Sequence, residues 1–154
     1  MNLYFLFITA FIFSISQNYT KLKWRYDIEI VSESDNSNYI VKVSTYSKKP
    51  ALDLELAKKS AIHGVIFKGV NNHPPLANNL SIEKSKYEFF REFFGPNRIF
   101  SKFVSEITKE SIGIDKIIKT KKGYKISSIL MINHVQLRKY LENQGIIKPL
   151  NYGL

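Results

Sequence analysis

Two segments in which apolar and polar residues alternate constrain the fold more than any other feature of this sequence. In the first, apolar residues fill every second position from Trp24 to Ile30, and the stretch from Tyr39 to Thr45 repeats the pattern after a polar turn. A period of two is typical of a strand that buries one face. We therefore predict an antiparallel hairpin over residues 24–45 with one face toward solvent.

The second alternating segment covers residues 114–132. Two isoleucine-rich runs, residues 114–119 and 124–132, flank the turn sequence Lys121-Lys122-Gly123, which predicts a second hairpin. One face of the run 124–132 is largely apolar, and Ile129 and Met131 make the other face partly apolar. A strand of that kind is buried on both sides, so we place it in the centre of the sheet.

Helical spacing replaces the alternation between the two hairpins. Apolar residues fall on one helical face from Leu54 to Val65, where Asp53 is the predicted N-cap and Gly69 the predicted stop. Gly64 interrupts this helix and predicts close packing against another element. The pair Ser85 and Glu88 has the spacing of a capping box, which predicts a helix over residues 86–94.

Further helical signals complete the order of elements. Phe100 to Ile107 continue at helical spacing, with an irregular segment as the alternative. A last helix is predicted from the N-cap Asn133 to a stop at Gly145. The predicted order is β-β-α-α-(α)-β-β-α. It describes an α+β domain, in which a mostly antiparallel sheet of about four strands carries helices on one face.

Residues 1–16 have the features of a signal peptide. An apolar run is followed by Ser14 and Ser16, which predicts cleavage between Ser16 and Gln17. The run is shorter than the roughly 20 residues of a membrane span. We expect residues 17–154 to form one α+β domain that is exported to the periplasm or the periphery of the outer membrane. A retained anchor and a buried N-terminal element are the alternatives.

The sequence carries no recognisable catalytic motif. It contains no cysteine, which excludes disulfides, thiolate metal sites and a lipidated cysteine. His63, His73 and His134 lack neighbours at metal-ligand spacing. We therefore expect no catalytic residue, no metal and no cofactor. A hydrolase that gathers acidic residues and histidines from separate elements remains a further alternative.

The formal net charge of +10 raises the question of an anionic partner. Only four of the 23 basic residues are arginine, the residue that grips phosphate through two parallel hydrogen bonds. This composition argues against nucleic acid and leaves anionic lipid or polymer as an alternative ligand. The candidate contacts surround the second turn: Lys119, Lys121, Lys122 and Lys125.

An aromatic cluster in the predicted helix 86–94 is the second candidate surface. Five aromatic side chains in eight residues cannot all share one face of a helix, so part of the cluster is either wedged into the core or exposed to a partner. The candidate partner-binding residues are Tyr87, Phe89, Arg91, Phe93 and Arg98.

Three stretches carry a family resemblance: Ala57–Gly69, Tyr87–Phe94 and Gly123–Leu154. Together they resemble a family of small, uncharacterised exported proteins of Gram-negative bacteria and are distantly similar to LPP20-type envelope lipoproteins, although the lipidated cysteine of the latter is missing. The resemblance implies a non-enzymatic, envelope-associated protein. We expect it to bind another envelope protein as an accessory of an envelope assembly or secretion system.

Overall fold

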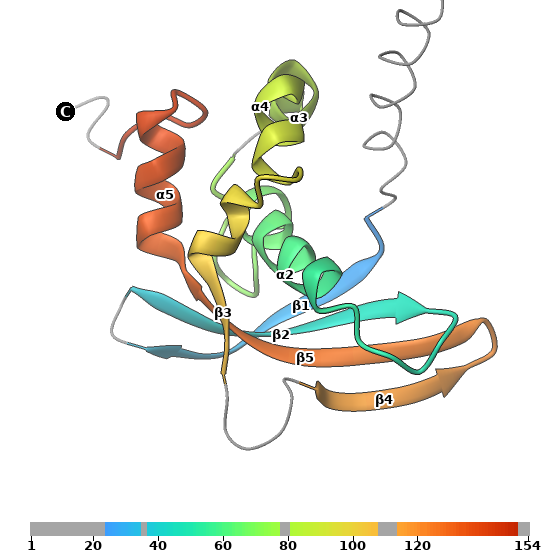
Figure 1. The fold of residues 1–154 in the computed structure, drawn as a ribbon. Helices are drawn as coiled ribbons and strands as arrows, with labels where there is room; N and C mark the ends of the chain where they lie inside the picture. The colour runs from blue at the N-terminus through green and yellow to red at the C-terminus, as the bar shows by residue number, and fades with distance from the viewer. Residues whose placement is uncertain (1–23, 35–36, 78–80, 108–113, 151–154) are drawn as a thin grey trace, which may run out of the picture.

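In the part of the chain that the structure describes, five strands form one antiparallel sheet and the helices gather on one of its faces (Figure 1). The computed structural model describes residues 24–34, 37–77, 81–107 and 114–150. The predicted α+β class is thereby confirmed. The strands are β1 (Tyr26–Ser34), β2 (Asn38–Ser47), β3 (Val104–Glu106), β4 (Ile114–Thr120) and β5 (Gly123–Asn133).

Strand β5 holds the sheet together. It pairs along its length with β2, which in turn pairs with β1, so the order across the sheet is β1-β2-β5. The other side of β5 is shared by two strands. β3 pairs with residues 130–132 and β4 with residues 123–128. The prediction of a central strand over residues 124–132 is therefore correct.

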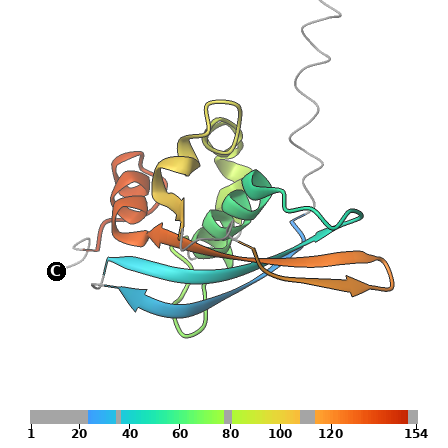
Figure 2. The same cartoon turned by 60° about the horizontal axis from the view of Figure 1, so that its bottom comes forward.

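The helical layer follows the order of the chain. It consists of α2 (Leu54–His63), the π-helical turn η2 (Gly64–Lys68), α3 (Ser81–Ser85), α4 (Tyr87–Phe93), the 3-10 turn η3 (Ile99–Phe103) and α5 (His134–Asn143). Turning the molecule shows the same separation of layers, since the helices stay on one side of the strands (Figure 2). Among the described residues, no helix combines the length and apolar character of a membrane span.

Local signals set the ends of the long helices as predicted. Asp53 Oδ1 accepts a hydrogen bond from the amide of Leu56 at 2.9 Å, and Asn133 Oδ1 accepts one from Gln136 at the same distance. Gly145 has φ +64° and directs the chain back so that the amide of Ile146 reaches Leu141 O. These contacts satisfy helix-end groups that would otherwise lack partners.

Two sequence predictions in the middle of the chain are wrong. Ser85 does not open a capping box with Glu88. Instead its hydroxyl donates backward to Ile82 O, because it ends the preceding helix α3. The stretch after Phe103 does not continue as a helix but becomes β3, whose residues pair with Leu130 to Ile132 of β5.

The core lies between the sheet and the helices, and aromatic rings supply much of it. Val41, Val43 and Leu130 are fully buried on the sheet side. Above them the aromatic residues Phe90, Phe93, Phe94 and Phe100 are also fully buried. Gly64 allows β1 to approach the helical layer, because a Cβ there would lie 3.0 Å from Ile28. This confirms the predicted close packing at Gly64.

Gly123 tests backbone packing at the second hairpin, and Gly145, which follows α5, serves as the control. Both have positive φ, but a Cβ on Gly123 would overlap Ser47 O, whereas a Cβ on Gly145 has no neighbour within 4 Å. We predict that Gly145→Ala lowers the free energy of unfolding by about 1 kcal/mol, through backbone strain alone. Gly123→Ala should lower it by about 3 kcal/mol, because the clash adds to the strain. Equal losses in urea unfolding would contradict this account.

Candidate functional site

Strand β4 forms an open edge of the sheet. Among the described strands it pairs with β5 alone, and both views place it on the outside, away from the helices (Figures 1 and 2). An edge strand presents a row of backbone N–H and C=O groups that can pair with another chain. Its position therefore makes β4 a candidate binding surface.

The side chains of β4 alternate in a regular way. Lys116 and Ile118 share the open face of the sheet, because they pair with β5 residues of that face, while Ile117 and Lys119 lie on the helix side. Each face of the strand thus carries one lysine and one isoleucine. Ile117 and Ile118 are each 41% exposed, and both lysines are exposed.

The turn after β4 adds further positive charge. Lys121 and Lys122 are both exposed in the two-residue turn, next to the exposed Lys119. Thr120 closes the turn, since its hydroxyl donates to Gly123 O at 3.1 Å and accepts from the amide of Lys122 at 3.3 Å. Three of the four predicted anionic contacts therefore gather at the tip of the hairpin.

Lys125, the fourth predicted contact, is engaged on the open face of the sheet. Its Nζ lies 2.8 Å from Asp27 Oδ2, which also accepts a hydrogen bond from the hydroxyl of Tyr46 at 2.8 Å. The hydrogen bond from Lys125, followed by that from Tyr46, lowers the pKa of Asp27, and the hydrogen bond to Asp27 raises the pKa of Lys125. This lysine links β5 to β1 across the intervening strand β2.

The opposite edge of the sheet, along β1, is capped by side chains. Asn71 Oδ1 accepts from the amide of Ile30 at 3.3 Å, and Asn71 Nδ2 donates to Ile30 O at 3.1 Å. Lys68 Nζ donates to Tyr26 O at 3.3 Å. These bonds occupy backbone groups of β1 that a further strand would need. Asn71 adopts a left-handed backbone with φ +51°, a conformation that asparagine tolerates well.

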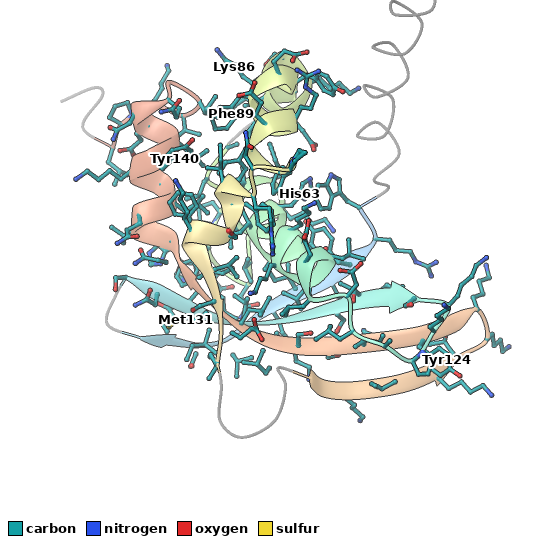
Figure 3. All side chains as sticks on the ribbon, in the orientation of Figure 1. His63, Lys86, Phe89, Tyr124, Met131 and Tyr140 are labelled. Carbon is teal, nitrogen blue, oxygen red and sulfur yellow. The ribbon has the colours of Figure 1, made fainter. Side chains whose placement is uncertain are left out.

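The aromatic residues predicted to bind a partner belong mainly to the core. Phe93 is fully buried, which removes it from any surface of this structure. Tyr87 and Phe89 are half-buried, and Phe89 stacks on Phe93 with ring centroids 5.6 Å apart. Phe89 also lies toward Tyr140 of α5, 6.3 Å between ring centroids (Figure 3). The cluster therefore joins α4 to α5.

The two predicted arginines are held by different elements. Arg91 pairs with Glu88 within α4. Arg98 Nε lies 3.5 Å from Glu55 Oε2 at the start of α2. Both pairs are partly exposed and contribute little to stability. These arginines do not lie beside the exposed lysines of the second hairpin. That hairpin is at the far end of the sheet, where Tyr124 is labelled (Figure 3).

A buried array around His63 is not foreseeable from the sequence, because its members lie far apart in the chain. The hydroxyl of Tyr26 lies 2.6 Å from His63 Nδ1, and Glu83 Oε1 lies 3.4 Å from His63 Nε2. Because a carboxylate only accepts, Nε2 carries the proton and Nδ1 accepts from Tyr26. Trp24 stacks on the imidazole with ring centroids 4.0 Å apart and its Nε1 donates to Glu83 at 3.3 Å.

Burial dominates the protonation of this array. It lowers the pKa of His63 against the opposing effect of Glu83, and it raises the pKa of Tyr26 together with the charge of Glu83. The contact with His63 lowers the pKa of Glu83. At neutral pH the array therefore consists of a neutral imidazole between a neutral phenol and a carboxylate.

A second, partly exposed array of a tyrosine, a histidine and a glutamate surrounds His73. Its Nδ1 lies 3.2 Å from the hydroxyl of Tyr39, and its Nε2 lies 2.8 Å from Glu33 Oε1. The ring of His134 stacks on Tyr39 with centroids 3.8 Å apart. Burial, and then the nearby His73, lower the pKa of His134.

Both arrays connect elements of the fold. Tyr26 and Tyr39 are buried, so neither hydroxyl is placed to attack a substrate from solvent. Among the described residues, no group of three histidine, aspartate or glutamate side chains could hold a metal ion. The arrays fasten β1 and β2 to the end of α2 and to the segments that follow it.

Comparison with known proteins supplies no family for this chain. No family model, curated protein or solved structure matches it. The site is therefore interpreted from its own geometry.

The hydrogen bond between Tyr26 and His63 can be tested by removing one oxygen atom. We predict that Tyr26→Phe lowers the free energy of unfolding by about 2 kcal/mol, because it leaves the buried Nδ1 without a donor. Tyr46→Phe removes a partly exposed hydroxyl that donates to Asp27, and it should cost about 0.5 kcal/mol or less. Urea unfolding measures the free energy of unfolding of both variants. Similar decreases in the two variants would show that the buried hydrogen bond contributes no more to stability than the exposed one.

The stability of the folded chain should depend on pH through His63. Burial lowers the pKa of His63 in the folded chain, so below the ordinary histidine pKa of about 6.5 the unfolded chain binds more protons than the folded chain. The free energy of unfolding therefore decreases as the pH is lowered from about 6.5 toward the pKa of folded His63. His63→Gln should reduce this slope between about pH 7 and 5, by at most about 1.4 kcal/mol per pH unit. His134 should maintain a residual slope, which the double variant with His134→Gln removes. An unchanged slope in urea unfolding of His63→Gln would refute the assignment.

Proposed function

We propose that this chain is an exported, envelope-associated protein without catalytic activity that binds another protein through the open edge of β4. The observation that carries the proposal is the difference between the two edges of the sheet. Lys68 and Asn71 cap backbone groups of β1, whereas no described strand pairs with the outer side of β4. A partner strand added to β4 would gain backbone hydrogen bonds along the whole element.

The exposed isoleucines support a protein partner. Ile117 and Ile118 are both 41% exposed, one on each face of β4. A strand paired with β4 would cover part of each side chain, and burial of apolar area favours association. Backbone bonds and apolar contacts would then act together at one place.

The histidine arrays support a structural role over catalysis. An unrecognised hydrolase would need an accessible nucleophile, but Tyr26 and Tyr39 are buried beside His63 and His73. His73 is bound on both nitrogens, by Tyr39 and Glu33. His63 Nδ1 is bound by Tyr26, and its Nε2 lies 3.4 Å from Glu83. Polar contacts between separate elements help to order a fold.

The proposed location rests on the sequence. The predicted signal peptide, residues 1–16, lies outside the residues that the structure describes. With the family resemblance, it supports a place in the periplasm or at the periphery of the outer membrane, as an accessory of envelope assembly or secretion.

A second candidate function is binding to anionic lipid or polymer. It is favoured by the exposed Lys119, Lys121 and Lys122 at the hairpin tip. Charge alone would drive such binding, so it should weaken steeply with salt and should not need the backbone of β4. That difference separates the two functions experimentally.

Two substitutions at Lys119 test the proposed function. The antiparallel ladder that starts at the Thr120–Gly123 pair places the amide of Lys119 on the free side of β4. Lys119→Pro removes this amide and the charge, whereas Lys119→Gln removes only the charge. We predict that a photo-crosslinker at Ile118 captures one envelope protein with the wild type and Lys119→Gln, and loses it with Lys119→Pro.

Circular dichroism would confirm that both Lys119 variants fold. Capture that persists in folded Lys119→Pro, or the absence of any specific crosslinked protein, would overturn binding through the edge. Equal, salt-sensitive binding of the wild type and Lys119→Pro to anionic vesicles or heparin would favour the second function instead.

A further inference from the structure

We infer that the segment that pairs with β4 is an extended, acidic stretch of the partner, with two apolar residues between two carboxylates. This inference rests on the proposed function and specifies the chemistry of the partner. It follows from the order of side chains along the open edge, which reads Lys116-Ile117-Ile118-Lys119. All four side chains are exposed, so a partner strand can contact each of them.

Cross-strand geometry predicts which side chains a partner strand should place opposite these four residues. Residues directly opposite in paired strands bring their Cβ atoms to about 5 Å, where opposite charges attract and like charges repel. A strand beside β4 would therefore favour aspartate or glutamate opposite Lys116 and Lys119, and apolar residues opposite Ile117 and Ile118. On each face of the sheet, the partner would contribute one carboxylate and one apolar side chain.

The preferred partner sequence is the same whether the partner strand runs parallel or antiparallel to β4. Lysine, isoleucine, isoleucine, lysine reads identically from either end, so an acidic–apolar–apolar–acidic segment satisfies it whether it runs parallel or antiparallel. The turn lysines Lys121 and Lys122 extend the positive field beyond one end of the strand. Additional acidic residues at the adjoining end of the segment would strengthen binding.

Strand β1 of a second copy does not satisfy the edge. Pairing of β4 with β1 of another copy would require backbone groups that Asn71 and Lys68 already occupy. The acidic side chains of β1 are also engaged, since Asp27 binds Lys125.

Synthetic peptides test this inference with the whole chain. Three fluorescent peptides share one extended sequence and differ only in the central motif, which is Glu-Val-Val-Glu, Gln-Val-Val-Gln or Lys-Val-Val-Lys. We expect the glutamate peptide to bind about tenfold more tightly than the glutamine peptide, since two charge pairs are lost in the latter, and the lysine peptide to bind least. The preference should shrink between about 50 and 200 mM salt.

A charge-reversed variant provides the matched control. Lys116→Glu combined with Lys119→Glu should invert the order, so that the lysine peptide binds best, while Lys119→Pro should weaken all three peptides. Equal binding of the glutamate and glutamine peptides, with loss in Lys119→Pro, would overturn the acidic partner and keep the edge as a docking site. Peptide binding that is unaffected by Lys119→Pro, or no binding of any peptide up to about 1 mM, would count against both proposals.

Discussion

The pairing of β2 with β5 is the interaction on which the rest of this molecule depends. It runs over ten residue pairs, from Asn38 with Asn133 to Ser47 with Tyr124, and joins segments that lie far apart in the chain. Every other strand is attached to one of these two. The fully buried side chains of Val41, Val43 and Leu130 belong to this pair of strands and form the sheet side of the core under the helical layer. Because this central pair leaves one free side on each strand, the fold must end in two edges.

The two edges are treated differently, and this difference gives the fold its candidate function. β1 lies beside the turn after η2, so Asn71 and Lys68 reach its backbone. β4 extends with the first residues of β5 beyond the helices, and no described strand pairs with its outer side (Figure 2). The same topology that protects the first edge therefore leaves the second accessible.

The sequence predicts what depends on neighbouring residues and misses what depends on folding. The caps at Asp53 and Asn133 act over three residues, so a sequence window contains the whole interaction. In contrast, the partners Tyr26 and His63 are 37 residues apart, and Glu33 and His73 are 40 apart.

Short elements limit sequence-based prediction for a related reason. The three residues of β3 are fewer than a period analysis requires, and pairing with β5 decides their conformation. The aromatic cluster was foreseeable as unusual, but only the packing of α5 against α4 shows that Phe93 is buried. Of the candidate sites, the lysines of the second hairpin could be named from the sequence because a turn is a local feature. The open backbone of β4 could not.

An exposed edge must avoid aggregation before it can serve a partner, and the lysines of β4 meet both requirements. Lys116 and Lys119 flank two exposed isoleucines, in the arrangement by which proteins discourage pairing with copies of themselves. Charges that discourage edge pairing also lower the affinity for neutral or basic strands. Protection alone would be achieved equally well by capping, as Asn71 does on β1. A strand that is charged but left uncapped retains its backbone groups for a chain of opposite charge, and this is the physical reason to regard β4 as a binding edge.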